Sequence, residues 1–160
     1  MPDREQARAY FEQSLGIEAH QQRALYNLGL LAFTSDPKNQ KKVEEARDRW
    51  LKATRLENWE QSPNANFPGH IYYCLACAFS RLAEHETGAQ EKGGLLDSAM
   101  EWLMKAAEKG STPESIVRKD LEAKGEEDLG ELARSTVYAN RIDKAMKMFR
   151  EAWKKRTESH

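Results

Sequence analysis

The sequence contains few cysteines: Cys74 and Cys77 are the only two among its 160 residues. Two cysteines are too few to form the disulfide framework of a small secreted domain. Long hydrophobic runs are also missing, since no stretch approaches the roughly 20 apolar residues that span a membrane. The charged start, MPDREQARAYFEQ, lacks the apolar segment of a signal peptide. We therefore expect no membrane span and a reducing compartment, which makes the cytoplasm the expected location.

An excess of one charge is missing as well, because 25 Lys and Arg residues balance 26 Asp and Glu residues. This balance provides no general attraction to nucleic acid or to an anionic membrane surface. The sequence also has no glycine-rich phosphate loop, no G-x-S-x-G segment and no H-E-x-x-H segment. We therefore expect a protein that is not an enzyme, holds no cofactor and binds no nucleic acid.

What the sequence does contain is a helical pattern that recurs. In residues 23–53, apolar residues follow the spacing of one helix face, stop at Asp36-Pro37, and resume at Ala46, Trp50 and Ala53. Proline after an acidic residue ends a helix and turns the chain back. The segment therefore predicts a helical hairpin, in which small residues let two helices approach and a large residue fills the groove between them.

Two later segments repeat this arrangement. The first helices of the three pairs share an apolar residue followed by a large and then a small one: Leu25, Leu28 and Gly29; Tyr72, Leu75, Ala76 and Phe79; Leu129, Leu132 and Ala133. The second helices share a small–large–small pattern: Ala46, Trp50 and Ala53; Ala99, Leu103 and Ala106; Ala145, Phe149 and Ala152. A single hairpin cannot bury its apolar face, so such repeats indicate a stack.

These residues resemble the tetratricopeptide repeat and its relative, the Sel1-like repeat. The resemblance implies an all-α fold of about seven to eight helices, in which antiparallel hairpins stack as a right-handed superhelix. We expect one domain over residues 1–160, with a leading helix at 3–20, repeats at 22–58, 69–112 and 126–158, and an extra helix at 113–125. Within it, loops are predicted at 54–69 and 84–94, and helices at 71–83, 95–109, 126–138 and 141–155.

The same resemblance implies a function, because tetratricopeptide arrays bind peptides in a concave groove lined by the first helix of each pair. Carried over by position, that groove would contain Arg23, Tyr26, Asn27, Leu30, Phe33, His70, Tyr73, Cys74, Cys77, Ser80, Arg81, Glu127, Glu131, Arg134 and Tyr138. Exposed Tyr26, Phe33 and Tyr73 would act as anchors, because aromatic and Arg side chains dominate binding surfaces. The alternative is that these aromatic residues pack against the extra helix or the 54–69 loop.

A competing hypothesis is a metal- or redox-responsive regulatory domain. His70, Cys74 and Cys77 lie at helical spacing on one face, and thiolates bind zinc well. A structural zinc site needs four ligands, and the sequence offers no second C-x-x-C segment or His pair. We therefore expect an adaptor for another protein, with no bound metal.

The two ends of the chain leave further alternatives. An exposed apolar side on the leading helix would favour a longer array or self-association through the terminal helices. The last helix mixes basic and apolar residues, as in helices that bind calmodulin or a membrane surface. Its small–large–small face favours ordinary packing on its neighbour, with the charges in solvent.

Overall fold

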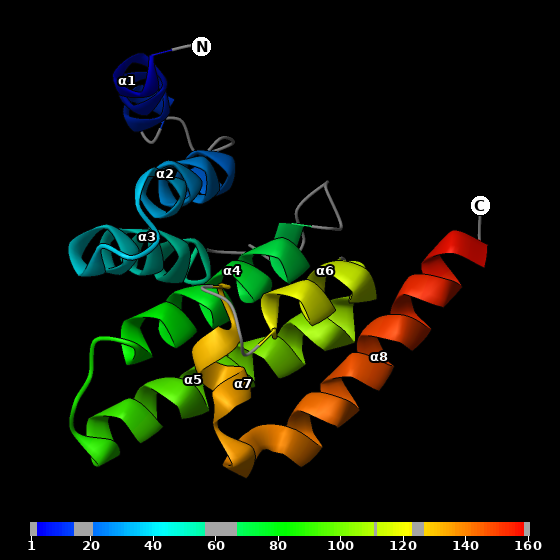
Figure 1. Ribbon diagram of the computed structural model, residues 1–160. Helices are drawn as coiled ribbons and strands as arrows, with labels where there is room; N and C mark the ends of the chain where they lie inside the picture. The colour runs from blue at the N-terminus through cyan, green and yellow to red at the C-terminus, as the bar shows by residue number, and fades with distance from the viewer. Residues whose placement is uncertain (1–2, 15–20, 57–66, 111, 123–126, 159–160) are drawn as a thin grey trace.

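The computed structural model describes residues 3–14, 21–56, 67–110, 112–122 and 127–158, and every regular secondary-structure element in this part of the chain is a helix (Figure 1). The elements are α1 (Arg4–Ser14), α2 (Gln21–Ser35), α3 (Gln40–Ala53), α4 (Phe67–Ala83), α5 (Ala89–Lys109), α6 (Glu114–Asp120), α7 (Gly130–Arg134), the short 3-10 helix η3 (Thr136–Tyr138) and α8 (Ala139–Glu158). The predicted all-α fold class is confirmed. None of these helices is both long and apolar enough to cross a bilayer.

The long helices pack in series. Along the chain, α1 contacts α2, α2 contacts α3, α3 contacts α4, α4 contacts α5, and α5 contacts α8 (Figure 1). The short helices pack onto the later long helices: α6 contacts α8, and α7 contacts α4 and α5. The helices α4 and α5 run side by side and are joined at one end, as an antiparallel pair (Figure 1). The right-handed superhelical twist of this stack stays a prediction.

The first pair, α2 and α3, depends on a glycine beneath a tryptophan. The α2 helix ends at Ser35, as Asp36-Pro37 predicts. A Cβ atom on Gly29 would lie only 2.2 Å from Nε1 of Trp50. The indole N–H of Trp50 also donates a hydrogen bond of 3.1 Å to the carbonyl oxygen of Tyr26. Only a residue without a side chain lets the two helices approach this closely, so the predicted small–large packing is confirmed here.

The same packing recurs further along the stack. The second helices bury their small–large–small residues almost completely: Ala46, Trp50, Ala53, Ala99, Leu103, Ala106, Ala145 and Phe149. The end of α5 adds a second required glycine, because Gly110 has φ 62° and a Cβ atom there would lie 2.2 Å from Cβ of Ala152. Glycine adopts this left-handed conformation without strain. The missing side chain at Gly110 also lets the end of α5 pack directly against α8.

The predicted loop at 84–94 is wrong in its second half, because α5 begins at Ala89 and runs through Gly93 and Gly94. Two glycines inside a helix cost about 1 kcal/mol each relative to alanine. Tertiary contacts offset this cost, since Lys92 forms an ion pair with Glu131 and Tyr138 donates to the Gly93 carbonyl at 3.4 Å. The α4 helix also begins earlier than predicted, at Phe67, and residues 57–66 of the predicted 54–69 loop lie outside the described part.

The predicted helix at 126–138 is also wrong. Residues 130–134 form the five-residue α7, Ser135 is extended with φ −84° and ψ 115°, and residues 136–138 form η3. The backbone here hydrogen-bonds to other elements, because the N–H of Leu129 donates to the Asp120 carbonyl at 2.8 Å and that of Leu132 donates to Ser80 Oγ at 3.2 Å. The third predicted repeat therefore contributes one long helix, α8, which packs on α5. Residues 15–20 and 123–126, parts of the leading and extra helices, lie outside the described part.

Candidate functional site

Apart from Phe33, the predicted groove residues described below fall into three environments, and the first is a partly exposed strip on α2 and the start of α4. We call this surface the α2–α4 strip; it consists of Arg23, Tyr26, Asn27, Leu30, His70 and Cys74. Arg23 is exposed and the other five are half-buried. Burial, and then the charge of Cys74 on α4, raise the pKa of Tyr26. The strip combines an aromatic and an aliphatic surface with polar groups at its edges.

At the α4 end of the strip, the charge of Arg156 on α8 acts on His70. Burial lowers the pKa of His70, and the positive charge of Arg156 lowers it further. The guanidinium of Arg156 donates a 3.0 Å hydrogen bond to the Lys109 carbonyl at the end of α5. At neutral pH His70 is therefore an uncharged imidazole, suited to hydrogen bonding.

One predicted anchor on α2 does not belong to this surface. Phe33 is only 7% exposed. Its ring packs against Trp50 with ring centroids 5.7 Å apart. The prediction that Phe33 is exposed is wrong, because the closely packed α2–α3 pair draws its side chain into the core.

The second environment is the rest of α4, which the chain itself covers. The Tyr73 hydroxyl donates to Oδ2 of Asp120, at the end of α6. The Arg81 guanidinium donates to Oδ1 of Asp128 through Nε at 3.0 Å and through Nη2 at 2.8 Å. The prediction that Arg81 is an anchor on the surface is wrong, because Arg81 is only 4% exposed. Tyr73 follows the alternative stated above, since it packs against the extra helix.

These contacts form a polar cluster, which we define as Tyr73, Cys77, Arg81, Asp120 and Asp128. Burial raises the pKa of Asp120, and the negative charge of Asp128 raises it further. The hydrogen bond from Tyr73 acts in the opposite direction but does not cancel the rise. Burial alone would lower the pKa of Arg81, but the hydrogen bonds and charge of Asp128 outweigh burial and raise it. The cluster therefore holds an arginine cation against closely spaced carboxyl groups.

The two cysteines are free thiols. Part of Cys74 is exposed, but burial of its thiol, followed by the charge of Asp128, raises its pKa to about 12. The same two causes raise the pKa of Cys77 well above its ordinary value. A reactive cysteine needs a lowered pKa, because the thiolate is the nucleophile. Neither thiol is therefore activated for redox or nucleophilic chemistry at neutral pH.

The third environment lies at the joined end of the α4–α5 pair. Glu131 contacts Lys92 and also Arg134, the latter at 2.7 Å. The Tyr138 hydroxyl donates to Asp97, and Tyr138 is 5% exposed. These side chains attach the 131–138 segment to the first turns of α5. They do not extend the α2–α4 strip, which lies at the other end of α4.

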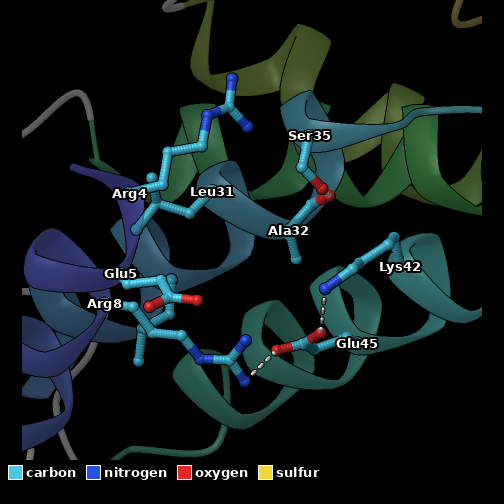
Figure 2. A pocket seen from close by; sticks show the side chains of 9 residues that line it. Arg4, Glu5, Arg8, Leu31, Ala32, Ser35, Lys42 and Glu45 are labelled. Atoms are coloured by element: carbon cyan, nitrogen blue, oxygen red, sulfur yellow. Dashed lines mark hydrogen bonds and ion pairs between the residues drawn. The ribbon is translucent and has the colours of Figure 1, made fainter. Parts of the chain in front are cut away.

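A cleft that the sequence did not indicate lies between α1, α2 and α3. It has a volume of about 210 Å³ and is lined by Arg4, Glu5, Arg8, Leu28, Leu31, Ala32, Ser35, Lys42 and Glu45. Figure 2 shows Arg8 and Lys42 both pointing at Glu45, at 2.9 and 3.8 Å. The charges around the cleft are largely paired with one another. The cleft depends on how α1 docks, which no local sequence signal determines.

The α1 helix itself is poorly buried. None of its described side chains, residues 4–10, is buried, and Tyr10 is 66% exposed. An ion pair between Arg8 and Glu45 ties α1 to α3. Self-association through this end of the molecule stays a prediction.

Comparison with family models, with curated proteins and with solved structures finds no match for this chain. The resemblance to tetratricopeptide and Sel1-like repeats therefore rests on its residue pattern, and a function has to be argued from the surface described above.

Proposed function

We propose that this protein is a non-enzymatic adaptor that binds a segment of a partner protein on the α2–α4 strip. One observation carries the proposal, namely that α2 has two apolar stripes. The first stripe, which includes Leu25, Leu28 and Ala32, is buried in the helix stack. The second contains Tyr26 and Leu30 at the spacing of one helix face, and packing leaves it half-buried. A continuous, partly apolar helix face of this kind is typical of a binding surface.

The chemistry of the strip suits a peptide with one apolar anchor. An aliphatic or aromatic side chain would lie against Tyr26 and Leu30. The amide of Asn27 would pair with the peptide backbone, because it offers both a donor and an acceptor. Rigid helices hold these groups in place before binding, which reduces the entropic cost of association. The raised thiol pKa of Cys74 further supports a binding role over a catalytic one.

The footprint would be smaller than that of a complete repeat array. The chain covers α4 from Tyr73 onward with its own residues, because Asp120 accepts from Tyr73, Asp128 accepts from Arg81 and Leu132 donates to Ser80. A partner would therefore contact α2 and the first turns of α4. A short segment with a few anchoring side chains fits this area better than a long extended peptide.

Selection from a random peptide display library on the immobilised protein tests the proposal without knowledge of the partner. We expect an enriched peptide whose binding is at least about tenfold weaker to a Leu30→Glu variant, since a buried apolar anchor contributes about 1.5–3 kcal/mol. The matched control is Val137→Glu, which places the same charge at an 80% exposed position on η3. This control should bind like the native protein.

A milder variant protects the test against a folding defect. Asn27→Ala removes the amide but keeps a helix-forming residue, so its circular dichroism spectrum should match that of the native protein. Weakened binding to both Leu30→Glu and Asn27→Ala supports the strip. Failure to enrich any peptide, or equal binding to all variants, overturns the proposal.

A further inference from the structure

The polar cluster brings together three side chains that can bind a metal, from three separate parts of the chain. The Sγ atom of Cys77, one carboxylate oxygen of Asp120 and one of Asp128 all lie within 4.8 Å of one another. Cys77 belongs to α4, Asp120 ends α6, and Asp128 precedes α7. The group contains neither His70 nor Cys74, so it differs from the ligand set that the sequence suggested.

The hydrogen bonds of the cluster leave ligand atoms available. Tyr73 donates to Oδ2 of Asp120, and Nε and Nη2 of Arg81 both donate to the same oxygen, Oδ1, of Asp128. Within the described part of the chain, no hydrogen bond engages Oδ1 of Asp120 or Oδ2 of Asp128. Each carboxylate is therefore held in place by one oxygen while the other remains available.

The Cys77 side chain is the second, independent indication of a ligand. It is only 5% exposed, and its Sγ atom lies within 4.8 Å of one carboxylate oxygen of Asp120 and one of Asp128. Its thiol makes no hydrogen bond to the described residues. A buried polar atom normally has a partner. The absence of one at this position is explained if the thiol is a ligand.

The charges of the cluster also favour a cation. Arg81 lies between Asp128 and Glu84, with its Nη1 atom 3.1 Å from Glu84. Lys119 offsets part of the charge of Asp120. The Arg81 cation is thus shared by two acids, and a third carboxyl group, that of Asp120, lies beside them. Closely spaced carboxylates in a half-buried position repel one another unless a proton or a cation joins them.

We propose that Cys77, Asp120 and Asp128 bind a divalent transition-metal ion, with Zn²⁺ as the best fit and water as the fourth ligand. Zinc accepts thiolate and carboxylate donors at about 2.3 and 2.0–2.2 Å in a tetrahedral arrangement, whereas Mg²⁺ and Ca²⁺ prefer oxygen alone. Binding exchanges the thiol proton of Cys77 for the metal, and the proton passes to solvent. The ion would fasten Asp120 and Asp128 to α4.

A cobalt titration of the reduced full-length chain tests this inference directly, because Co²⁺ replaces Zn²⁺ and its bond to a thiolate produces a charge-transfer absorption band. We expect the band in the native protein and its removal by added zinc. The matched control is Cys74→Ser, one helical turn away and outside the group, which should keep the band. Cys77→Ser should lose it.

A third variant provides a route that does not depend on cysteine. Asp120→Asn keeps an oxygen that accepts the Tyr73 hydrogen bond but is a poor metal ligand, and should weaken cobalt binding by about tenfold or more. Zinc should raise the melting temperature of the native and Cys74→Ser proteins and leave that of Cys77→Ser unchanged. No band in the native protein at saturating cobalt, or an undiminished band in Cys77→Ser, overturns the inference.

Discussion

Replacing Gly29 by alanine is the sharpest test of how the first two long helices pack. In an ordinary helix interior, Gly→Ala stabilises a protein by about 0.5–1 kcal/mol because alanine loses less backbone entropy. At Gly29 the added Cβ would lie 2.2, 2.5 and 2.7 Å from Nε1, Cε2 and Cδ1 of Trp50. The ring is only 1% exposed and is held by its hydrogen bond to the Tyr26 carbonyl, so it has little room to move.

The magnitude follows from these two opposing terms. Overpacking a well-filled core costs about 1–3 kcal/mol, and contacts this short belong in the upper half of that range. Subtracting the helix gain of about 0.5–1 kcal/mol leaves a net loss of about 1–2.5 kcal/mol. For a domain of this size each kcal/mol lowers the melting temperature by about 2–4 °C.

Urea unfolding followed by far-ultraviolet circular dichroism measures this effect, with an unchanged dependence on urea as the check on two-state behaviour. The matched control is Gly94→Ala in α5, where an added Cβ meets nothing within 4 Å. It should stabilise the protein by about 0.5–1 kcal/mol. In a Trp50→Leu background the cost of Gly29→Ala should largely vanish. If Gly29→Ala stabilises as much as Gly94→Ala, the packing described here is incorrect.

Two further predictions concern single polar contacts. Ser80→Ala leaves the buried N–H of Leu132 without its acceptor and should lower the free energy of unfolding by about 1–3 kcal/mol. It should also speed amide exchange at residues 129–134. The control Ser115→Ala, at an exposed position, should leave stability unchanged. The hydrogen bonds from Arg150 are the main reason that the pKa of Glu114 is lowered from 4.5 to about 2. This contribution to stability is complete above about pH 5 and is lost as the pH falls through 4.5 towards 2, because the unfolded state takes up the proton first. The Glu114→Gln variant should therefore lose less stability than the native protein over that interval, and equal losses would contradict the assignment.

Local signals in the sequence predicted the ends of several helices correctly. The Asp36-Pro37 turn and the Gly110 cap act through the backbone of the residues beside them, so neither depends on the rest of the fold. The small–large–small spacing also predicted which side chains the second helices bury, because a helix face fixes which residues point the same way. The start of α5 was missed because contacts with Glu131 and Tyr138, far along the chain, stabilise a turn that contains two glycines.

The candidate site was predictable only in part, and the polar face of α4 shows why. Tyr73, Cys77 and Arg81 lie on one helical face, and such a face looks the same in the sequence whether solvent, a partner or the chain itself covers it. Asp120 and Asp128 each cover it from 47 residues away, beyond the reach of any periodic pattern. On α2, Arg23 is exposed and Tyr26, Asn27 and Leu30 are half-buried, whereas Phe33 packs in the core against Trp50, 17 residues away in the sequence.

Hydrogen exchange of the protein with and without a display-selected peptide tests the central claim, that the α2–α4 strip is the binding surface. The account predicts slower exchange on binding in residues 21–35 and 67–74, with residues 75–83 unchanged because residues 127–132 already cover them. Protection confined to α1 or α8, with α2 unaffected, would contradict it.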